Sequence, residues 1–292
     1  MVVESVSAVA TATSTTLTIT KPTGVEVGDL LVAVLTSHDA EAGANDGTWS
    51  TLATWTSAIG ALYGGNLFGM SIQYRVATST DVSTSNYTFS HSQNETLRGY
   101  MLRCSGNNVV DGGLAVAEGY TNSSANSATY NDAITPYTPL VDGALVIMQI
   151  GLISSPTFGG SISAYTVPNV SFTEAYDNYF GDGTPAGLVA SAYGIQSTAS
   201  EITSNQATII NAWDEHYGQF VVFNPPVPAT GTNTLVTTTS EALAQTGTCD
   251  TNGTNNLETT TSETFTQSGR GEAPQQWTEP PRSTDNWTNK NI

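Results

Sequence analysis

Acidic side chains and histidines gather at three places in the sequence where they could do chemistry. His38 and Asp39 stand close to Glu41 and Asp46 on an expected loop, where such a group could hold a metal ion or transfer protons. Their spacing matches no zinc-ligand pattern, so we favour an ordinary loop between strands. The second place, residues 213–216 (WDEH), favours a turn between two strands over a reactive group.

The third place is a Gly-rich stretch, expected to be a loop, that carries Glu174, Asp177 and Asp182. Two carboxyl groups held a defined distance apart can cleave glycosidic bonds, and clustered oxygen donors on a turn can bind calcium. The sequence contains no Gly-x-Ser-x-Gly nucleophile elbow and no Gly-Lys-Ser/Thr phosphate loop. We therefore predict a protein that is not an enzyme and has no catalytic, cofactor-binding or metal-binding residues. Calcium at this loop and a depolymerase activity are the alternatives.

The charge balance of the chain is strongly acidic. Its 292 residues include seven Lys and Arg against 25 Asp and Glu, which gives a net charge of −18 at pH 7. This balance argues against nucleic acid and membrane surfaces as partners, because both are anionic. We interpret the acidity as a source of solubility and mutual repulsion. The alternative is binding of divalent cations or of a basic partner surface.

The sequence also carries information on the cellular compartment. The first twenty residues (MVVESVSAVATATSTTLTIT) contain neither a basic leader nor a continuous apolar stretch, so no secretory signal is predicted. No apolar window reaches the length of a membrane span. Cys104 lies in an apolar run far from Cys249, which indicates a buried thiol and no disulfide framework. We expect synthesis and assembly in a host cytoplasm.

Short apolar segments bounded by Gly, Asn, Asp, Pro and Ser predict an all-β protein. Residues 15–20 and 70–76 alternate polar and apolar side chains, which is typical of a strand with one exposed face. Residues 30–35 are continuously apolar, which is typical of a strand covered on both faces. No segment shows helical periodicity between caps, so we predict an antiparallel β-sandwich or jelly-roll-like domain. Further strands are expected at residues 87–89, 100–104, 144–152, 170–172, 188–193, 208–212 and 219–223.

The composition changes where the last expected strand ends. Residues 224–228 (NPPVP) cannot continue a central strand, so we place a globular domain at residues 1–227 and an extended Thr/Ser/Asn-rich tail at 228–292. Residues 232–247 (TNTLVTTTSEALAQTG) and 254–269 (TNNLETTTSETFTQSG) form an internal repeat with a 22-residue offset. Two or three such units are too few to enclose a core of their own.

Two interpretations of the tail stay open at this point. A disordered polar linker would account for its composition. An extended assembly arm, ordered by a partner, would account for the spaced apolar residues, which a pure spacer does not need. Such an arm could add a strand to a neighbour's sheet edge and place its apolar side chains in pockets. These tail anchors are Leu235, Leu243, Leu257, Phe265, Trp277 and Trp287.

Several motifs resemble a β-sandwich domain that is common in phage virion proteins and also occurs on bacterial surfaces. The opening resemblance lies in residues 16–24 (TLTITKPTG) and 27–33 (VGDLLVA). Later motifs are similar at 74–77 (YRVA), 87–89 (YTF) and 103–106 (RCSG). The chain departs from the family after the second strand, where it has Gly-Thr-Trp in place of Pro-x-Gly-Trp. The resemblance brings no catalytic residues with it.

The second half continues this resemblance more loosely. Residues 142–146 (DGALV) resemble the family's second long buried strand, and residues 276–279 (QWTE) and 282–288 (RSTDNWT) look like Trp-Thr-Glu repeats that end structural proteins of marine phages. On physical grounds, Arg75 and Arg103 stand beside apolar strand residues, where each could pair with a carboxylate at a strand end.

Together these features predict a bacteriophage virion structural protein, either a capsid decoration or a tail or fibre appendage. It would act by assembly through its tail, with itself (a trimer is favoured) and with other virion proteins. The alternative is a carbohydrate- or receptor-binding adhesion module for a host surface glycan. Exposed aromatic side chains would favour that alternative, although we expect most of them to fold back onto the domain.

Overall fold

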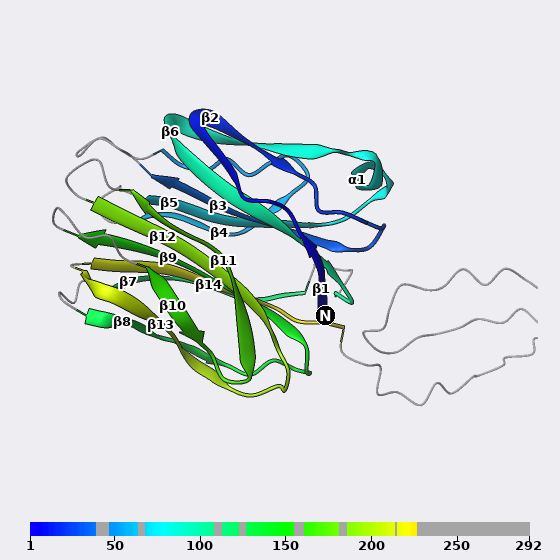
Figure 1. Cartoon of the computed structure of the whole chain (residues 1–292). Helices are drawn as coiled ribbons and strands as arrows, with labels where there is room; N and C mark the ends of the chain where they lie inside the picture. The colour runs from blue at the N-terminus through cyan, green and yellow to red at the C-terminus, as the bar shows by residue number, and fades with distance from the viewer. Residues whose placement is uncertain are drawn as a thin grey trace, which may run out of the picture. The chain divides into compact units, whose positions relative to one another are not determined.

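The structure is a computed structural model, and most of its described residues form β-strands (Figure 1). The all-β prediction is therefore confirmed, with antiparallel pairing throughout the described strands. The tail and its six anchors lie outside the described residues. The residues that the structure describes are 1–38, 47–63, 68–107, 113–122, 127–154, 161–180, 186–213 and 215–226.

The first half of the chain builds one sheet. Its strand order is β1-β6-β3-β5-β4, and β2 pairs with the long strand β6. A single short helix, α1 (Ser79–Ser83), connects β5 to β6 and was missed in the sequence because five residues give no periodicity. The strands are β1 (Val2–Val6), β2 (Ala10–Thr20), β3 (Leu30–His38), β4 (Thr56–Tyr63), β5 (Phe68–Val76) and β6 (Asn86–Ser105).

The second half builds two further sheets. The larger has the strand order β11-β12-β9-β14-β7, and the smaller has the order β10-β13-β8. Their strands are β7 (Leu114–Asn122), β8 (Ser127–Tyr137), β9 (Ala144–Ser154), β10 (Ile162–Thr166), β11 (Val170–Phe180), β12 (Ala186–Gln196), β13 (Ile202–Trp213) and β14 (Glu215–Phe223).

Three apolar clusters lie between the layers of strands. The first joins the sheet of β3 to the sheet of β9, where residues such as Val32 and Ile72 pack with Ile147 and Val221. The second lies between the sheets of β9 and β13. The third covers the other face of β3 with side chains from β2 and the first half of β6. Because β3 and β9 are covered on both faces, each reads in the sequence as a continuous apolar run.

One prediction about β5 was wrong. Met70, Ile72 and Tyr74 face the first cluster as expected, but Ser71 and Gln73, which we expected to face solvent, are also buried. Residues 50–55 fold over that face of the strand. The side chain of Gln73 accepts a hydrogen bond from the Leu52 amide (2.9 Å) and donates one to the Ser50 carbonyl (3.0 Å). A polar side chain can therefore mark a covered face when the covering segment presents backbone groups.

Candidate functional site

The family-like motifs meet at turns that ion pairs hold together. Nε of Arg103 lies 2.6 Å from Oδ2 of Asp29, and the Glu26 amide donates to the same oxygen at 2.7 Å. The predicted pairing of Arg103 with a carboxylate is confirmed. Gly24 has φ +72°, and a Cβ there would lie 2.7 Å from Nη1 of Arg103, so the turn requires glycine. The arrangement joins the start of β3 to the end of β6.

The second ion pair lies beside α1 and confirms the prediction for Arg75. Nη2 of Arg75 is 3.0 Å from Oδ2 of the buried Asp81. That oxygen also accepts hydrogen bonds from the amide and hydroxyl of Thr78, both at 2.7 Å, and Oδ1 accepts one from the Tyr87 hydroxyl at 2.6 Å. Nζ of Lys21 donates to the α1 carbonyls of Asp81 and Val82, which suits the negative end of a helix.

Opposing causes set the pKa of Asp81. Burial favours the neutral acid, but the hydrogen bonds from Tyr87 and Thr78 and the charge of Arg75 favour the carboxylate, and the pKa is lowered overall. In the same contact, burial and the carboxylate raise the pKa of the Tyr87 hydroxyl. A carboxylate whose two oxygens are both hydrogen-bonded within the fold suits a structural role.

Glu174 and Asp177 are not on a loop, as we had expected; both lie on strand β11. A register irregularity between Glu174 and Tyr176 separates them in the pairing with β12. Oδ2 of Asp177 accepts a hydrogen bond from the Ile162 amide at 2.9 Å, which ties β11 to the start of β10. Asp182 lies outside the described residues.

The two β11 carboxyl groups titrate in the opposite direction to Asp81. Burial raises the pKa of Glu174, and the neighbouring Asp177 charge raises it further. Burial also raises the pKa of Asp177, opposed only by the bond from Ile162. Two raised carboxyl groups can hold a proton or a cation. In the described parts of the chain, however, no group of three His, Cys, Asp or Glu could ligate a metal.

The other two predicted groups are described only in part. His38 ends β3 and is buried, and burial together with the charge of Arg98 lowers its pKa to about 4, so its imidazole is neutral at physiological pH. Asp39, Glu41 and Asp46 lie outside the described residues. In the WDEH segment, Trp213 ends β13, and Glu215 and His216 already belong to β14, so these three residues lie in strands and not in the expected turn. Asp214 lies outside the described residues.

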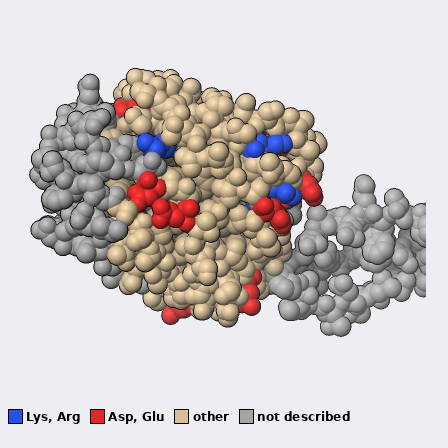
Figure 2. Space-filling model, viewed as in Figure 1, with Lys and Arg blue, Asp and Glu red and all other residues tan. Residues whose placement is uncertain are grey.

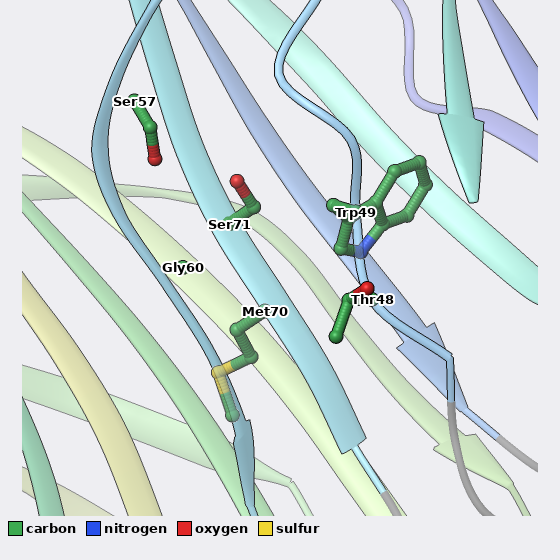
Figure 3. Close-up of a pocket in the computed structure, with 6 residues that line it drawn as sticks. All are labelled: Thr48, Trp49, Ser57, Gly60, Met70 and Ser71. Atoms are coloured by element: carbon green, nitrogen blue, oxygen red, sulfur yellow. The ribbon is translucent and has the colours of Figure 1, made fainter. Parts of the chain in front are cut away.

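A small pocket opens beside Trp49 (Figure 3). Its volume is about 130 Å³, well below the hundreds of Å³ typical of small-molecule sites. Nε1 of Trp49 donates to the Gly69 carbonyl at 3.2 Å, and its ring meets the buried His91 edge-on, with centroids 5.0 Å apart. The lining residues are Thr48, Trp49, Ser57, Gly60, Met70 and Ser71.

Aromatic side chains that the sequence placed in loops mostly cover the core where they are described. Trp55 is buried against Tyr87 and Phe89, and Trp49 is half-buried. This confirms for both tryptophans that they fold back onto the domain. The side chains of Tyr63, Tyr120, Tyr130 and Tyr179 lie outside the described set.

A polar seam, which we define as Thr36, Gln149, Tyr176, Tyr100 and Ser191, runs through the apolar cluster between the first and second sheets. Nε2 of Gln149 donates to the Leu35 carbonyl at 2.8 Å and to the Thr36 hydroxyl, which also shares a hydrogen bond with Tyr176. The hydroxyls of Tyr100 and Ser191 lie 2.9 Å apart. This seam was not predicted from the sequence. Its signal was a glutamine inside an otherwise apolar run.

The comparisons with known proteins add no identity. No family model matches the chain, and no curated protein or solved structure matches it. Among the described residues, no helix is long and apolar enough to cross a membrane. Cys104 is a buried free thiol, as predicted, and burial raises the pKa of this thiol to about 12.

Proposed function

We propose that the protein is a structural component of a bacteriophage particle, as a capsid decoration or as part of a tail or fibre appendage. It has a jelly-roll-like sandwich followed by an extended tail, and it assembles in the host cytoplasm into the virion. One observation carries the proposal. The motifs that resemble phage virion domains supply Asp29, Arg75 and Arg103, and all three side chains are engaged in ion pairs within the fold.

The distribution of charge also supports an associative role. On the face shown in Figure 2, acidic and basic side chains form a few small groups, and most of the surface is uncharged. Large uncharged polar surfaces pack against copies or partners without the cost of removing charges from water. In this proposal, the tail anchors contact neighbouring subunits, which are further copies of the chain in a trimer and other virion proteins.

The test uses the full-length protein and its two tail tryptophans. The variant W277A/W287A removes two large apolar anchors, and T278A/T288A, which changes the residue beside each tryptophan, is the matched control. We expect the wild type and the control to form a discrete oligomer by light scattering, and the tryptophan variant to have a lower molar mass. Equal masses for all three, or a monomeric wild type, would contradict assembly through the tail.

A host glycan receptor is the alternative function. The Trp49 pocket, with its hydroxyl-bearing lining, is the described feature that favours it. Titration with a panel of monosaccharides, followed by tryptophan fluorescence, tests this alternative. A saturable change that W49F loses would favour glycan binding, whereas an unchanged spectrum at millimolar sugar would count against it.

A further inference from the structure

We propose that the open edge of β2 at Thr16–Thr20 is a two-fold contact between two copies of this chain. Thr16–Thr20 pairs with Asn86–Ser90 of β6, and β2 pairs with no other described strand. On the far side of β6, the Ser50 amide donates to the Ser90 carbonyl at 2.9 Å. The strand β2 is therefore the outermost strand of this layer (Figure 1).

Backbone hydrogen-bonding groups of β2 point to the open edge at alternate residues. The register that pairs Thr18 with Thr88 sets Lys21 opposite Ser85. The Lys21 amide donates to the Ser85 carbonyl at 3.0 Å, so these two residues form a hydrogen-bonded pair. Because hydrogen-bonded and non-bonded pairs alternate along an antiparallel ladder, Leu17 and Ile19 bond β6 while Thr16, Thr18 and Thr20 direct their N–H and C=O groups outward. The hydroxyls of Thr18 and Thr88 lie 2.9 Å apart, consistent with the close side chains of a non-bonded pair.

This edge carries no charged residue, unlike other edges of the protein, and its own register irregularity, between Ser14 and Thr16, lies just before the open segment. Natural edge strands are blocked by charges, proline, bulges or short length. Strand β11 combines an irregular register with Glu174 and Asp177, and β8 contains Asp132 and Pro136. In contrast, no charged residue occurs from Ser5 to Thr20.

The charge pattern allows a second copy as the occupant. Copies with a net charge of −18 repel one another, but two β2 edges can approach without bringing like charges together, because no charged residue occurs from Ser5 to Thr20. The contact is also self-complementary. With a two-fold axis at Thr18, antiparallel pairing sets Thr16 opposite Thr20 and Leu17 opposite Ile19 of the other copy. The buried side chains of both strands then remain on the core side.

The two-fold contact does not depend on the virion role and does not use the tail. It therefore has to be measured where the tail contact is disabled, in full-length W277A/W287A. We expect this variant to have the mass of two chains. Adding T18K should halve this mass, because two ammonium groups would face each other at the axis. Adding T13K instead places the lysine at an exposed residue of β2 outside the proposed contact between copies, so the variant should keep the mass of two chains.

Two outcomes would overturn the β2 contact. One is a single-chain mass for W277A/W287A, and the other is an unchanged mass with T18K. The virion proposal fails on a separate result, namely an equal mass for the wild type and W277A/W287A.

A charge pair tests the register itself. In the same background, T16K/T20E places opposite charges across the proposed axis, whereas T16K/T20K places like charges there. We expect the first to keep two chains and the second to separate them. Equal masses for these two variants would overturn the register, whatever the common value.

Discussion

Asp81 and Asp177 show how differently one fold can treat the same side chain. Asp81, in α1, accepts hydrogen bonds from Thr78 and Tyr87 and forms an ion pair with Arg75, and its pKa is lowered. Asp177, on β11, accepts one backbone hydrogen bond next to another acid, and its pKa is raised. The first carboxylate stabilises the fold by being charged, and the second is tolerated despite its charge.

The difference between the two aspartates arises from the few cations of the chain. Arg75 and Arg103 lie on the first sheet and pair with Asp81 and Asp29. These two ion pairs therefore hold the turns of the first half in place. On β11, no ion pair is described for Glu174 or Asp177, and burial raises the pKa of both carboxyl groups.

The largest effect is expected from D81A. The substitution leaves the Arg75 guanidinium and the Tyr87 hydroxyl without their acceptor and removes the N-terminal capping bonds of α1. Breaking a buried pair in this way costs about 3 kcal/mol of unfolding free energy, measured by urea denaturation. V82A, at the exposed neighbour, should cost less than about 0.5 kcal/mol. A loss for D81A as small as that for V82A would contradict the structural role of the pair.

A smaller effect is expected from the polar seam, where Tyr176 can be compared with Tyr165, a tyrosine outside the seam. Y176F removes the hydroxyl that bonds Thr36 and should lower the unfolding free energy by about 1 kcal/mol. Y165F removes a buried hydroxyl that has no hydrogen-bond partner, so stability should stay equal or rise. Equal losses for the two variants would show that the hydrogen bond to Thr36 contributes nothing.

The smallest effect, of opposite sign to D81A, is expected from D177N. Because the folded pKa of Asp177 is raised, ionising it costs more in the folded than in the unfolded protein, and this cost appears as the pH rises through the acidic range. Asparagine keeps an acceptor for the Ile162 amide without the charge. The melting temperature should therefore rise slightly at pH 7.

The same variant has an internal control in its pH dependence. Near pH 3, Asp177 is protonated in the wild type, so D177N and the wild type should have the same melting temperature. The contribution of Asp81, whose pKa is lowered, is lost only as the pH falls further through its folded pKa. A D177N protein that melts lower than the wild type at pH 7 would contradict the assignment.

Much of the first sheet could be predicted from the sequence, because local pattern and turn chemistry agree there. The apolar run of β3 and the pairing of Arg103 are examples. Burial of Gln73 could not be predicted, because the covering residues 50–55 carry no signal of where they fold. The strand position of Glu174 and Asp177 was also missed, since the neighbouring glycines favoured a loop. In both cases the structure of the segment depends on contacts with another segment, residues 50–55 for Gln73 and strand β12 for Glu174 and Asp177.

The candidate site shows the same division. The sequence indicated that Arg75 and Arg103 pair with carboxylates but not which ones, and the Gln149 seam depends on contacts between β9 and β3, more than a hundred residues apart in the chain. A lone glutamine in an apolar run indicates a buried polar contact without indicating its partner. The tail anchors stay a prediction.

The central claim is that this protein acts by assembly, and the most direct test is the molar mass of the full-length chain beside a chain that ends at Val227. Both are measured by light scattering at the same concentrations. The account predicts a discrete, larger oligomer for the full-length protein and a fall to the β2-linked pair on truncation. Equal masses for the two proteins, whether of one chain or of more, would contradict it.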